Sequence, residues 1–201
     1  MNIIPALSAF AIGRPEGHPM MAPAQARQNY DLSVEEAING QIMNELAASY
    51  AYLAMANHFG RVEVAMPGAQ RYFLQQSYEE REHAQKLIDY QIKRGGRVVL
   101  SDLAKPQQDE WKNLQAAFKS ALELERGNNQ ALLKLHSLAG QKNDPDCTNF
   151  LEEHYLREQV IEIEEMARRY NQLRRVGEGL GEHLFDQELI RETEKKEPKS
   201  E

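Results

Sequence analysis

Apolar residues recur at seven-residue steps in four stretches of the chain, a pattern typical of amphipathic helices that turn one stripe toward a common core. Each stripe is interrupted by an acid or an amide, the first of them Glu45. We therefore expect four core-forming helices that carry polar groups into their shared interior. The four stripes are Ile38, Glu45, Tyr52 and Phe59; Phe73, Glu80 and Leu87; Phe118, Glu125, Leu132 and Ala139; and Glu152, Gln159, Met166 and Leu173.

Proline and glycine mark the ends of these helices, because proline inside a helix removes a hydrogen bond and clashes with the preceding turn. Ser33 and Glu36 are spaced as a capping box at the start of the first helix, and Asp144 before Pro145 is typical of a helix start. A short fifth helix follows the last glycine cluster. The predicted helices span about 33–59, 67–95, 110–139, 144–176 and 182–192.

The connection between the second and third helices is long, running from Gly95 to about Gln108, and it contains the β-favouring residues Val98 and Val99. The second helix is about 40 Å long, and the connection reaches about 45 Å when it is extended. The third helix is therefore expected to start at the same end as the second and to run parallel to it. The sequence predicts an all-α four-helix bundle with one long crossover loop.

The acids on the stripes need a physical explanation, because burying an unpaired carboxylate costs several kcal/mol. Three of them, Glu45, Glu80 and Glu125, would together oppose folding of the bundle. A multivalent cation bound between them removes the conflict. The alternative is that these glutamates lie on solvated helix faces. It does not explain why the apolar stripes of four helices are interrupted by polar residues at similar depth.

The spacing around Glu80 indicates what kind of metal site this is. His83 follows Glu80 by three residues, so both side chains lie on one helical face. A Glu-x-x-His pair with a single Glu from another helix is half of the carboxylate di-metal pattern. Glu45 supplies that single Glu, Glu125 supplies the one for the other half, and Gln159-x-x-Glu162 stands where a second Glu-x-x-His is expected. Oxygen ligands with one histidine suit iron, so we expect a di-iron centre (Fe) with one looser position.

Composition narrows the function classes. The chain has 201 residues and a formal net charge of -7, which disfavours nucleic acid and anionic membranes as partners. Its apolar runs are shorter than the ~20 residues of a membrane helix. A single cysteine, Cys147, excludes an intrachain disulfide and a cysteine-rich zinc module, which suits the cytoplasm.

Four motifs then resemble one family closely: eukaryotic ferritin of the heavy-chain, catalytic type. The resemblance covers about residues 26–189 and implies a 24-subunit hollow shell that oxidises Fe(II) with dioxygen and stores the ferric mineral. Such a shell consists of this chain alone or of this chain with other ferritin subunits. The motifs are Arg27-Gln28-Asn29-Tyr30, Glu80-Arg81-Glu82-His83-Ala84, Lys142-Asn143-Asp144-Pro145, and His154-Tyr155-Leu156 to Gln159.

The resemblance also implies roles for individual residues. Position by position, the ferroxidase ligands of the family match Glu45, Glu80, His83, Glu125 and Gln159, with Glu80 as the expected bridge between two irons. Tyr52 matches the family's tyrosine beside the centre, and it is either an electron or hydrogen-bond donor or a core residue. Glu79 matches an acid that passes iron toward the cavity.

Two positions depart from the family. Glu162 stands where heavy chains usually have a small or polar residue, and it is either an additional ligand of the second iron or a solvated-face residue. Asn149 replaces the usual aspartate of the threefold channel, which leaves Glu152 as the matched acid, with His136 and Asp146 as helpers. An amide weakens the cation-attracting field there, so we expect slower iron uptake.

The resemblance divides the chain into three parts: an N-terminal extension at 1–25, a ferritin-like di-iron domain at 26–192 and a charged, disordered tail at 193–201. The extension is expected to lie outside the shell. If it is instead a targeting peptide, the protein is secreted or organellar.

Two other function classes remain open. One is a storage subunit whose acids only nucleate mineral, and the other is a structural or signalling four-helix bundle.

In the fifth helix, Leu180, Leu184 and Glu188 share a face that either borders a fourfold axis, as the resemblance implies, or packs on the shell.

Overall fold

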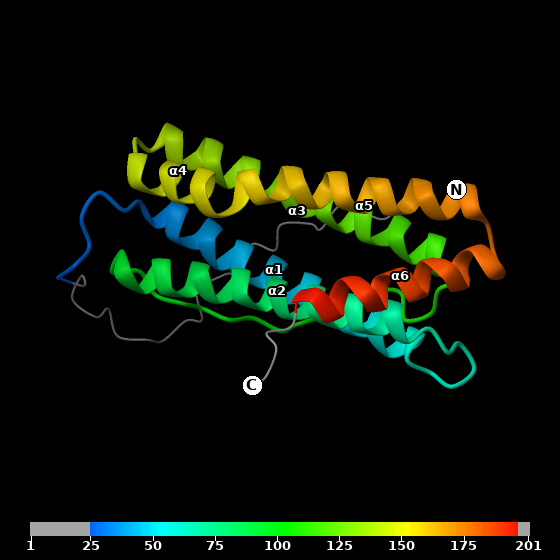
Figure 1. Ribbon diagram of the computed structural model, residues 1–201. Helices are drawn as coiled ribbons and strands as arrows, with labels where there is room; N and C mark the ends of the chain where they lie inside the picture. Colours follow the sequence, from blue (N-terminus) through cyan, green and yellow to red (C-terminus); the bar gives the residue numbers. More distant parts are fainter. Residues whose placement is uncertain (1–24, 197–201) are drawn as a thin grey trace, which may run out of the picture.

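The computed structural model describes residues 25–196, and this part of the chain is built from helices without any strand (Figure 1). The elements α4, η1 and α5 follow one another directly, with η1 a single π-helical turn between two α-helices. The bounds are α1 Leu32–Phe59, α2 Pro67–Lys93, α3 Leu114–Gln141, α4 Pro145–Leu151, η1 Glu152–Leu156, α5 Arg157–Val176 and α6 Leu180–Lys196.

The helices pack as two hairpins, α1 with α2 and α3 with α4, η1 and α5, and the hairpins meet where α1 contacts α3. Figure 1 shows the crossover running back along the bundle from the end of α2, so that α3 starts at the same end as α2 and runs parallel to it. The predicted four-helix bundle with one long crossover and a C-terminal helix is confirmed.

Side chains of α1 and α2 hold the start of this crossover in place. The Asn39 amide donates to the Arg97 carbonyl oxygen and its Oδ1 accepts from the Val99 N–H, both at 3.0 Å. The Arg97 N–H donates to Glu35 Oε1 at 2.9 Å, and the Gln91 amide donates to the Arg97 carbonyl oxygen at 3.3 Å. These bonds satisfy extended backbone that lacks a neighbouring strand.

The apolar core consists of two clusters at opposite ends of the bundle. One contains the stacked rings of Tyr52 and Phe73 with Phe118 tilted against them, and the other is built around Ile38 and Leu87. On each of the first three helices the stripe acid falls between the residues of the two clusters. The acids therefore form a polar layer midway along the bundle.

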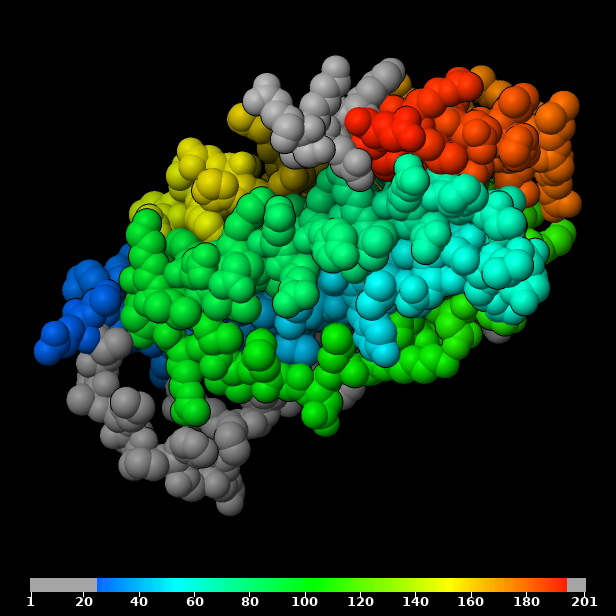
Figure 2. Space-filling view, turned by 60° about the horizontal axis from the view of Figure 1, so that its bottom comes forward, coloured from blue at the N-terminus to red at the C-terminus, as the bar shows by residue number. Residues whose placement is uncertain are grey.

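Helix α6 packs on α2, and its side chains cap the first turns of α2 and α3. Asp186 is buried, and its Oδ1 accepts from the Ala69 N–H in the first turn of α2 at 2.8 Å. Glu182 accepts in the same way from the Leu114 N–H at the start of α3. A Cβ on Gly68 would lie 2.0 Å from the Asp186 carbonyl oxygen, so glycine is required for this contact. In Figure 2 α6 lies against the N-terminal half of α2.

Three helix boundaries differ from the sequence-based expectation. Asp31, rather than Ser33, caps α1, and its Oδ1 accepts from the Ser33 N–H at 2.8 Å. Asn113 caps α3, which starts at Leu114, four residues after the predicted position. Both caps are short polar side chains that satisfy N–H groups of the first turn.

The C-terminal boundary also differs, because α6 continues to Lys196 and so includes the start of the predicted charged tail. Buried Thr193 donates to the Leu189 carbonyl oxygen at 3.0 Å within this helix. Residues 1–24 of the extension predicted at 1–25, and the end of the tail at 197–201, lie outside the described residues. Within 25–196, no helix has the length and apolarity needed to cross a membrane.

Candidate metal centre

The polar layer brings the predicted ligands together from four helices. Glu45 comes from α1, Glu80 and His83 from α2, Glu125 from α3 and Gln159 from α5, and each is at most 5% exposed. Their seven-residue register with the apolar stripes places them at one depth, as the sequence predicts.

The acids and the histidine form two clusters that share one residue. Ligand atoms of Glu45, Glu80 and His83 lie within 4.8 Å of one another, and so do those of Glu80, Glu125 and Glu162. Glu80 belongs to both clusters, the arrangement expected of a residue that bridges two cations. Glu162 is half-buried and belongs to the second cluster, so it does not lie on a solvated face.

Amides hold Glu45 in the first cluster. The Gln41 amide donates to Glu45 Oε1 and the Asn128 amide donates to Glu45 Oε2, both at 2.8 Å. Gln41 also donates to Asn128 Oδ1 at 2.6 Å, which links the two supports. All three residues are buried, so these bonds fix the position of the carboxylate before any cation binds.

Glu125 and Gln159 organise the second cluster. The Tyr52 hydroxyl donates to Glu125 Oε1, and Gln159 Nε2 donates to Glu125 Oε2 at 2.9 Å and also to Glu162. Gln159 Oε1 is buried and has no hydrogen-bond partner in the structure. Because an unsatisfied buried acceptor is costly, this oxygen is suited to ligate a cation.

The raised pKa values of the carboxyl groups show that negative charge is unfavourable in this layer. Burial raises the pKa of Glu80 well above its usual range, and the nearby Glu125 and Glu45 carboxylates raise it further. Burial also raises the pKa of Glu125 to about 8, with Glu162 adding to the effect, and burial raises the pKa of Glu162 itself. The cluster therefore favours bound protons or bound cations over free negative charge.

The π-helical turn η1 lies next to the centre. Tyr155, within this turn, donates its hydroxyl to the His83 carbonyl oxygen at 2.8 Å, and its ring meets the imidazole edge-on. Gln159 follows three residues after η1 ends. A π-turn inserts one residue into an α-helix and is frequent at functional sites. The turn could not be predicted from the sequence, because Glu152 and Gln159 also fit an uninterrupted α-helical stripe.

The structure separates Glu79 from the two clusters. Glu79 is half-buried, and the amides of Gln75 and Gln76 donate to its two carboxylate oxygens. It stands beside the centre, near enough for its charge to raise the pKa of Glu125.

The predicted channel residues are only partly brought together. His136 Nε2 lies 2.7 Å from Glu152 Oε1, whereas Asp146 accepts from the Tyr90 hydroxyl at 2.9 Å and pairs with Arg94. Asp146 is exposed, and its expected role as a channel helper stays a prediction. Asn149 is exposed on α4.

Sequence reasoning missed three residues that support the centre: Gln41, Asn128 and Glu158. Helical spacing carries the signal in each case, because Gln41 precedes Glu45 by four residues, Asn128 follows Glu125 by three and Glu158 precedes Glu162 by four. The ligand atoms of Glu158 lie within 4.8 Å of those of His83 and Glu162.

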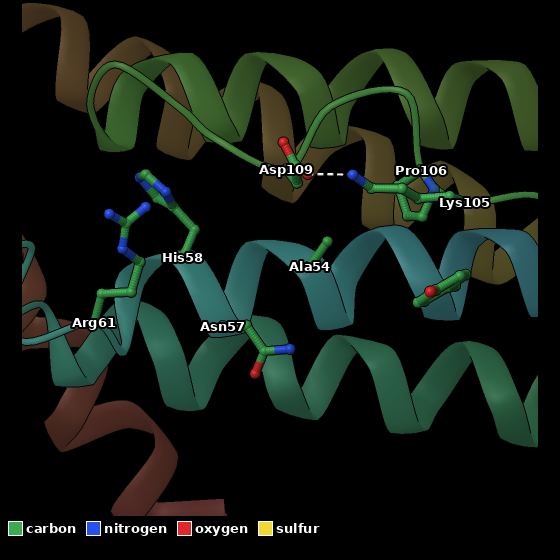
Figure 3. A pocket seen from close by; sticks show the side chains of 8 residues that line it. Ala54, Asn57, His58, Arg61, Lys105, Pro106 and Asp109 are labelled. Carbon is green, nitrogen blue, oxygen red and sulfur yellow. Dashed lines mark hydrogen bonds and ion pairs between the residues drawn. The ribbon is translucent and has the colours of Figure 1, made fainter.

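A surface hollow of about 390 Å³ lies elsewhere, between the end of α1 and the crossover (Figure 3). Asn57 and His58 line it from α1, while Lys105 and Asp109 form an ion pair across from them. None of the predicted ligands lines this hollow, so the metal centre is a separate, buried feature of the bundle interior.

The donor set of the centre is made of carboxylate oxygens, one amide oxygen and one imidazole nitrogen. Such a set suits divalent cations of the first transition series, iron among them, and does not suit soft ions that select sulfur. The unpartnered Gln159 oxygen and the raised carboxyl pKa values are the features of this structure that fit cation binding.

Comparison with known proteins agrees with the fold. Residues 35–176 match the ferritin-like domain family, a range that includes all the candidate ligands. The chain is also 50% identical to a soma ferritin of Lymnaea stagnalis over 170 residues, which make up 85% of this chain and 98% of that protein. The chain therefore belongs to the ferritin family, whose function is iron storage.

Proposed function

We propose that this chain is a heavy-chain-type ferritin subunit that oxidises Fe(II) to Fe(III) with dioxygen and stores the ferric product inside a 24-subunit shell. The observation that carries the proposal is the pair of buried carboxylate clusters that share Glu80. A subunit that only nucleates mineral needs surface acids, and it does not need this buried layer or the energetic cost of burying it.

Two ferrous ions are the substrates of the centre, one in each cluster. Glu45, Glu80 and His83 bind the first ion, while Glu80, Glu125, Gln159 and Glu162 bind the second. Holding two ions against one shared carboxylate lets a single dioxygen molecule take one electron from each ion, which gives two ferric ions.

The residues around the ligands control orientation and release. Gln41 and Asn128 hold Glu45 in its binding orientation, and Tyr52 holds Glu125 through its hydroxyl. Because the second cluster has no histidine of its own, we expect it to bind ferric product less tightly. Glu79, with its amide-held carboxylate beside the centre, is positioned to accept the product as it leaves.

The assembly part of the proposal is supported by exposed apolar side chains on α6. Leu180 and Leu184 are 72% and 60% exposed, while Phe185 and Leu189 on the opposite side are buried in this chain. Such a face is suited to packing between subunits. We assign the His136–Glu152 pair and Asn149 to the path by which iron reaches the shell interior.

The test is Fe(II) oxidation, followed together with oxygen consumption, in the wild-type protein and in two matched variants. Glu80→Gln removes the shared charge and is expected to slow oxidation about 100-fold or more, the scale of losing an essential ligand. Glu82→Gln makes the same change two residues away at an exposed position and is expected to leave the rate unchanged. Equal rates in the two variants would contradict the proposal.

The shell itself is tested by sedimentation velocity of the full-length protein. A 24-subunit particle of the 23.0 kDa chain is expected. A monomer or dimer that still oxidises iron would remove the shell from the proposal and leave the centre.

A further inference from the structure

The imidazole of His83 lies between two acids, one on each side of the ring. Nδ1 is 3.5 Å from Glu80 Oε2, and Nε2 is 3.4 Å from Glu158 Oε2. The His83 side chain is 6% exposed, whereas that of Glu158 is 46% exposed. Glu80 is part of the metal centre, but Glu158 has no role in the proposed reaction so far.

The chemistry of imidazole makes these two contacts unequal. A neutral ring offers one nitrogen lone pair and one N–H, so only one of its nitrogens binds a cation. When Nδ1 is the ligand, Nε2 carries the proton and needs an acceptor, since a buried N–H without a partner is unfavourable. Glu158 Oε2 is the carboxylate oxygen on that side of the ring.

The backbone around both residues is fixed. Tyr155 in η1 donates to the His83 carbonyl oxygen at 2.8 Å and packs its ring against the imidazole. Glu158 lies on the first turn of α5, directly after η1, and Gln159 beside it is tied to Glu125 and Glu162. The ring and the acid are therefore presented to each other by well-anchored elements.

We propose that Glu158 is a positioning residue for the metal centre. It accepts the Nε2–H of His83, which selects one tautomer and keeps the Nδ1 lone pair facing the cation position formed with Glu45 and Glu80. A carboxylate behind a metal-bound histidine also makes the ring a stronger donor. The inference rests on the proposed cation-binding centre and adds a residue outside its ligand set.

The same side chains could instead bind a cation, and the test must distinguish that cation from a hydrogen bond between His83 and Glu158. Ligand atoms of His83, Glu158 and Glu162 lie within 4.8 Å of one another and form a third cluster. A cation there would use the Nε2 lone pair, so it would compete with the inner position for the one lone pair of the ring. The positioning role predicts that Nε2 keeps its proton and that the third cluster holds no ion once the inner position is filled.

The experiment measures Zn²⁺ affinity of the intact protein by competition with a chelating dye, so that no redox step is involved. Glu158→Ala is expected to weaken zinc binding about 10- to 100-fold, the usual effect of removing the acceptor behind a histidine ligand. Glu158→Gln retains an oxygen that accepts the Nε2–H and is expected to recover most of the affinity. Glu153→Ala, at an exposed acid five residues earlier, is the matched control and should bind zinc as the wild-type protein does.

A second readout follows the ring itself, through solid-state ¹⁵N spectra of the zinc-loaded protein with labelled histidine. The wild-type protein should show His83 with zinc on Nδ1 and a proton on Nε2, and Glu158→Ala should show a mixture of the two forms. Crystals soaked in Zn²⁺ should hold an ion among Glu45, Glu80 and His83.

Three results would overturn the inference. These are equal zinc affinity in Glu158→Ala and wild-type protein, a Glu158→Gln variant as weak as Glu158→Ala, and a zinc ion bound among His83 Nε2, Glu158 and Glu162. Each of them leaves the ferroxidase proposal intact. Failure of the wild-type protein to bind zinc among Glu45, Glu80 and His83 would overturn the proposed function and this inference together.

Discussion

The two halves of the metal centre are built differently, although both lie in the same polar layer. In the half formed by α1 and α2, a histidine accompanies the acids, and two amides hold Glu45 through both of its oxygens. In the half formed by α3 and α5, an amide and a carboxylate replace the Glu-x-x-His pair, and Gln159 Oε1 has no partner. Each half holds one carboxylate through both oxygens, Glu45 by two amides and Glu125 by Tyr52 and Gln159, but only the second half has a buried oxygen left for a cation to satisfy.

This difference suggests that one half binds its cation tightly and the other half releases its cation. A site with an imidazole donor binds its cation more tightly, and a site with only carboxylate and amide oxygens releases its cation more easily. A centre that must bind iron and also release product needs one half that binds tightly and one half that binds weakly. Glu80, shared by both halves, keeps the two cations close.

The largest expected effect on cation binding comes from removing the histidine of the first half. His83→Ala should weaken zinc binding at the tighter position about 100-fold, which is about 2.7 kcal/mol. Gln159→Ala should weaken only the second position, by about 10-fold, because an amide oxygen is the poorer donor. Isothermal titration with Zn²⁺ resolves the two steps. Equal losses in both variants would show that the halves are equivalent.

The second prediction concerns Glu162, which lies in one cluster with Glu80 and Glu125. If its carboxylate ligates the second ion, Glu162→Ala should change the rate of Fe(II) oxidation several-fold, on the order of the loss of one weak ligand. Glu164→Ala, at an exposed acid on the same helix that pairs with Arg168, is the control. Stopped-flow absorbance of ferric product gives the rates, and an unchanged rate in Glu162→Ala would exclude a ligand role.

The third prediction follows from the raised pKa of Glu125. Its pKa is about 8 in the folded, metal-free protein against a reference value of 4.5, so the folded state binds the extra proton between these pH values. This contribution to stability is full below about pH 4.5 and is lost as the pH rises toward 8, at up to about 1.4 kcal/mol per pH unit.

Thermal unfolding of the metal-free protein at a series of pH values measures this effect. Glu125→Gln cannot titrate and should flatten the pH dependence, while Zn²⁺, which competes with the proton, should release protons on binding at pH 7. An identical pH dependence in Glu125→Gln would show that the second half does not store a proton.

The smallest expected effect lies outside the centre. Asn149→Asp restores a negative charge near the proposed uptake path and should speed iron oxidation about two- to threefold at low ionic strength, less at high salt. The same assay, with Asn171→Asp as an exposed control on α5, measures the change. No acceleration would mean that uptake does not limit the rate and that the centre alone sets it.

Periodicity predicted much of this molecule because it reports which helix face is buried. The register of Glu45, Glu80 and Glu125 with their apolar neighbours placed all three at one depth, as the structure has them. The long link after Gly95 likewise predicted the parallel course of α3. These features depend on residue spacing along one helix and on the length of a connecting segment, and both can be read from the sequence.

Other features depend on contacts between distant segments, which spacing does not contain. Asn128 supports Glu45 from another helix, and Asp186 caps α2 from the far end of the chain. The ion pair of Asp146 with Arg94 is another contact between distant segments that spacing does not show. The turn at η1 was not predicted because Glu152 and Gln159 keep the seven-residue spacing of the stripe across it.

The most direct test of the account is a crystal structure of the protein soaked anaerobically in Fe(II), with anomalous differences recorded at the iron edge. The account predicts one iron among Glu45, Glu80 and His83, and a second, with lower occupancy, among Glu80, Glu125 and Glu162. The absence of iron from both positions in a fully loaded crystal would contradict it.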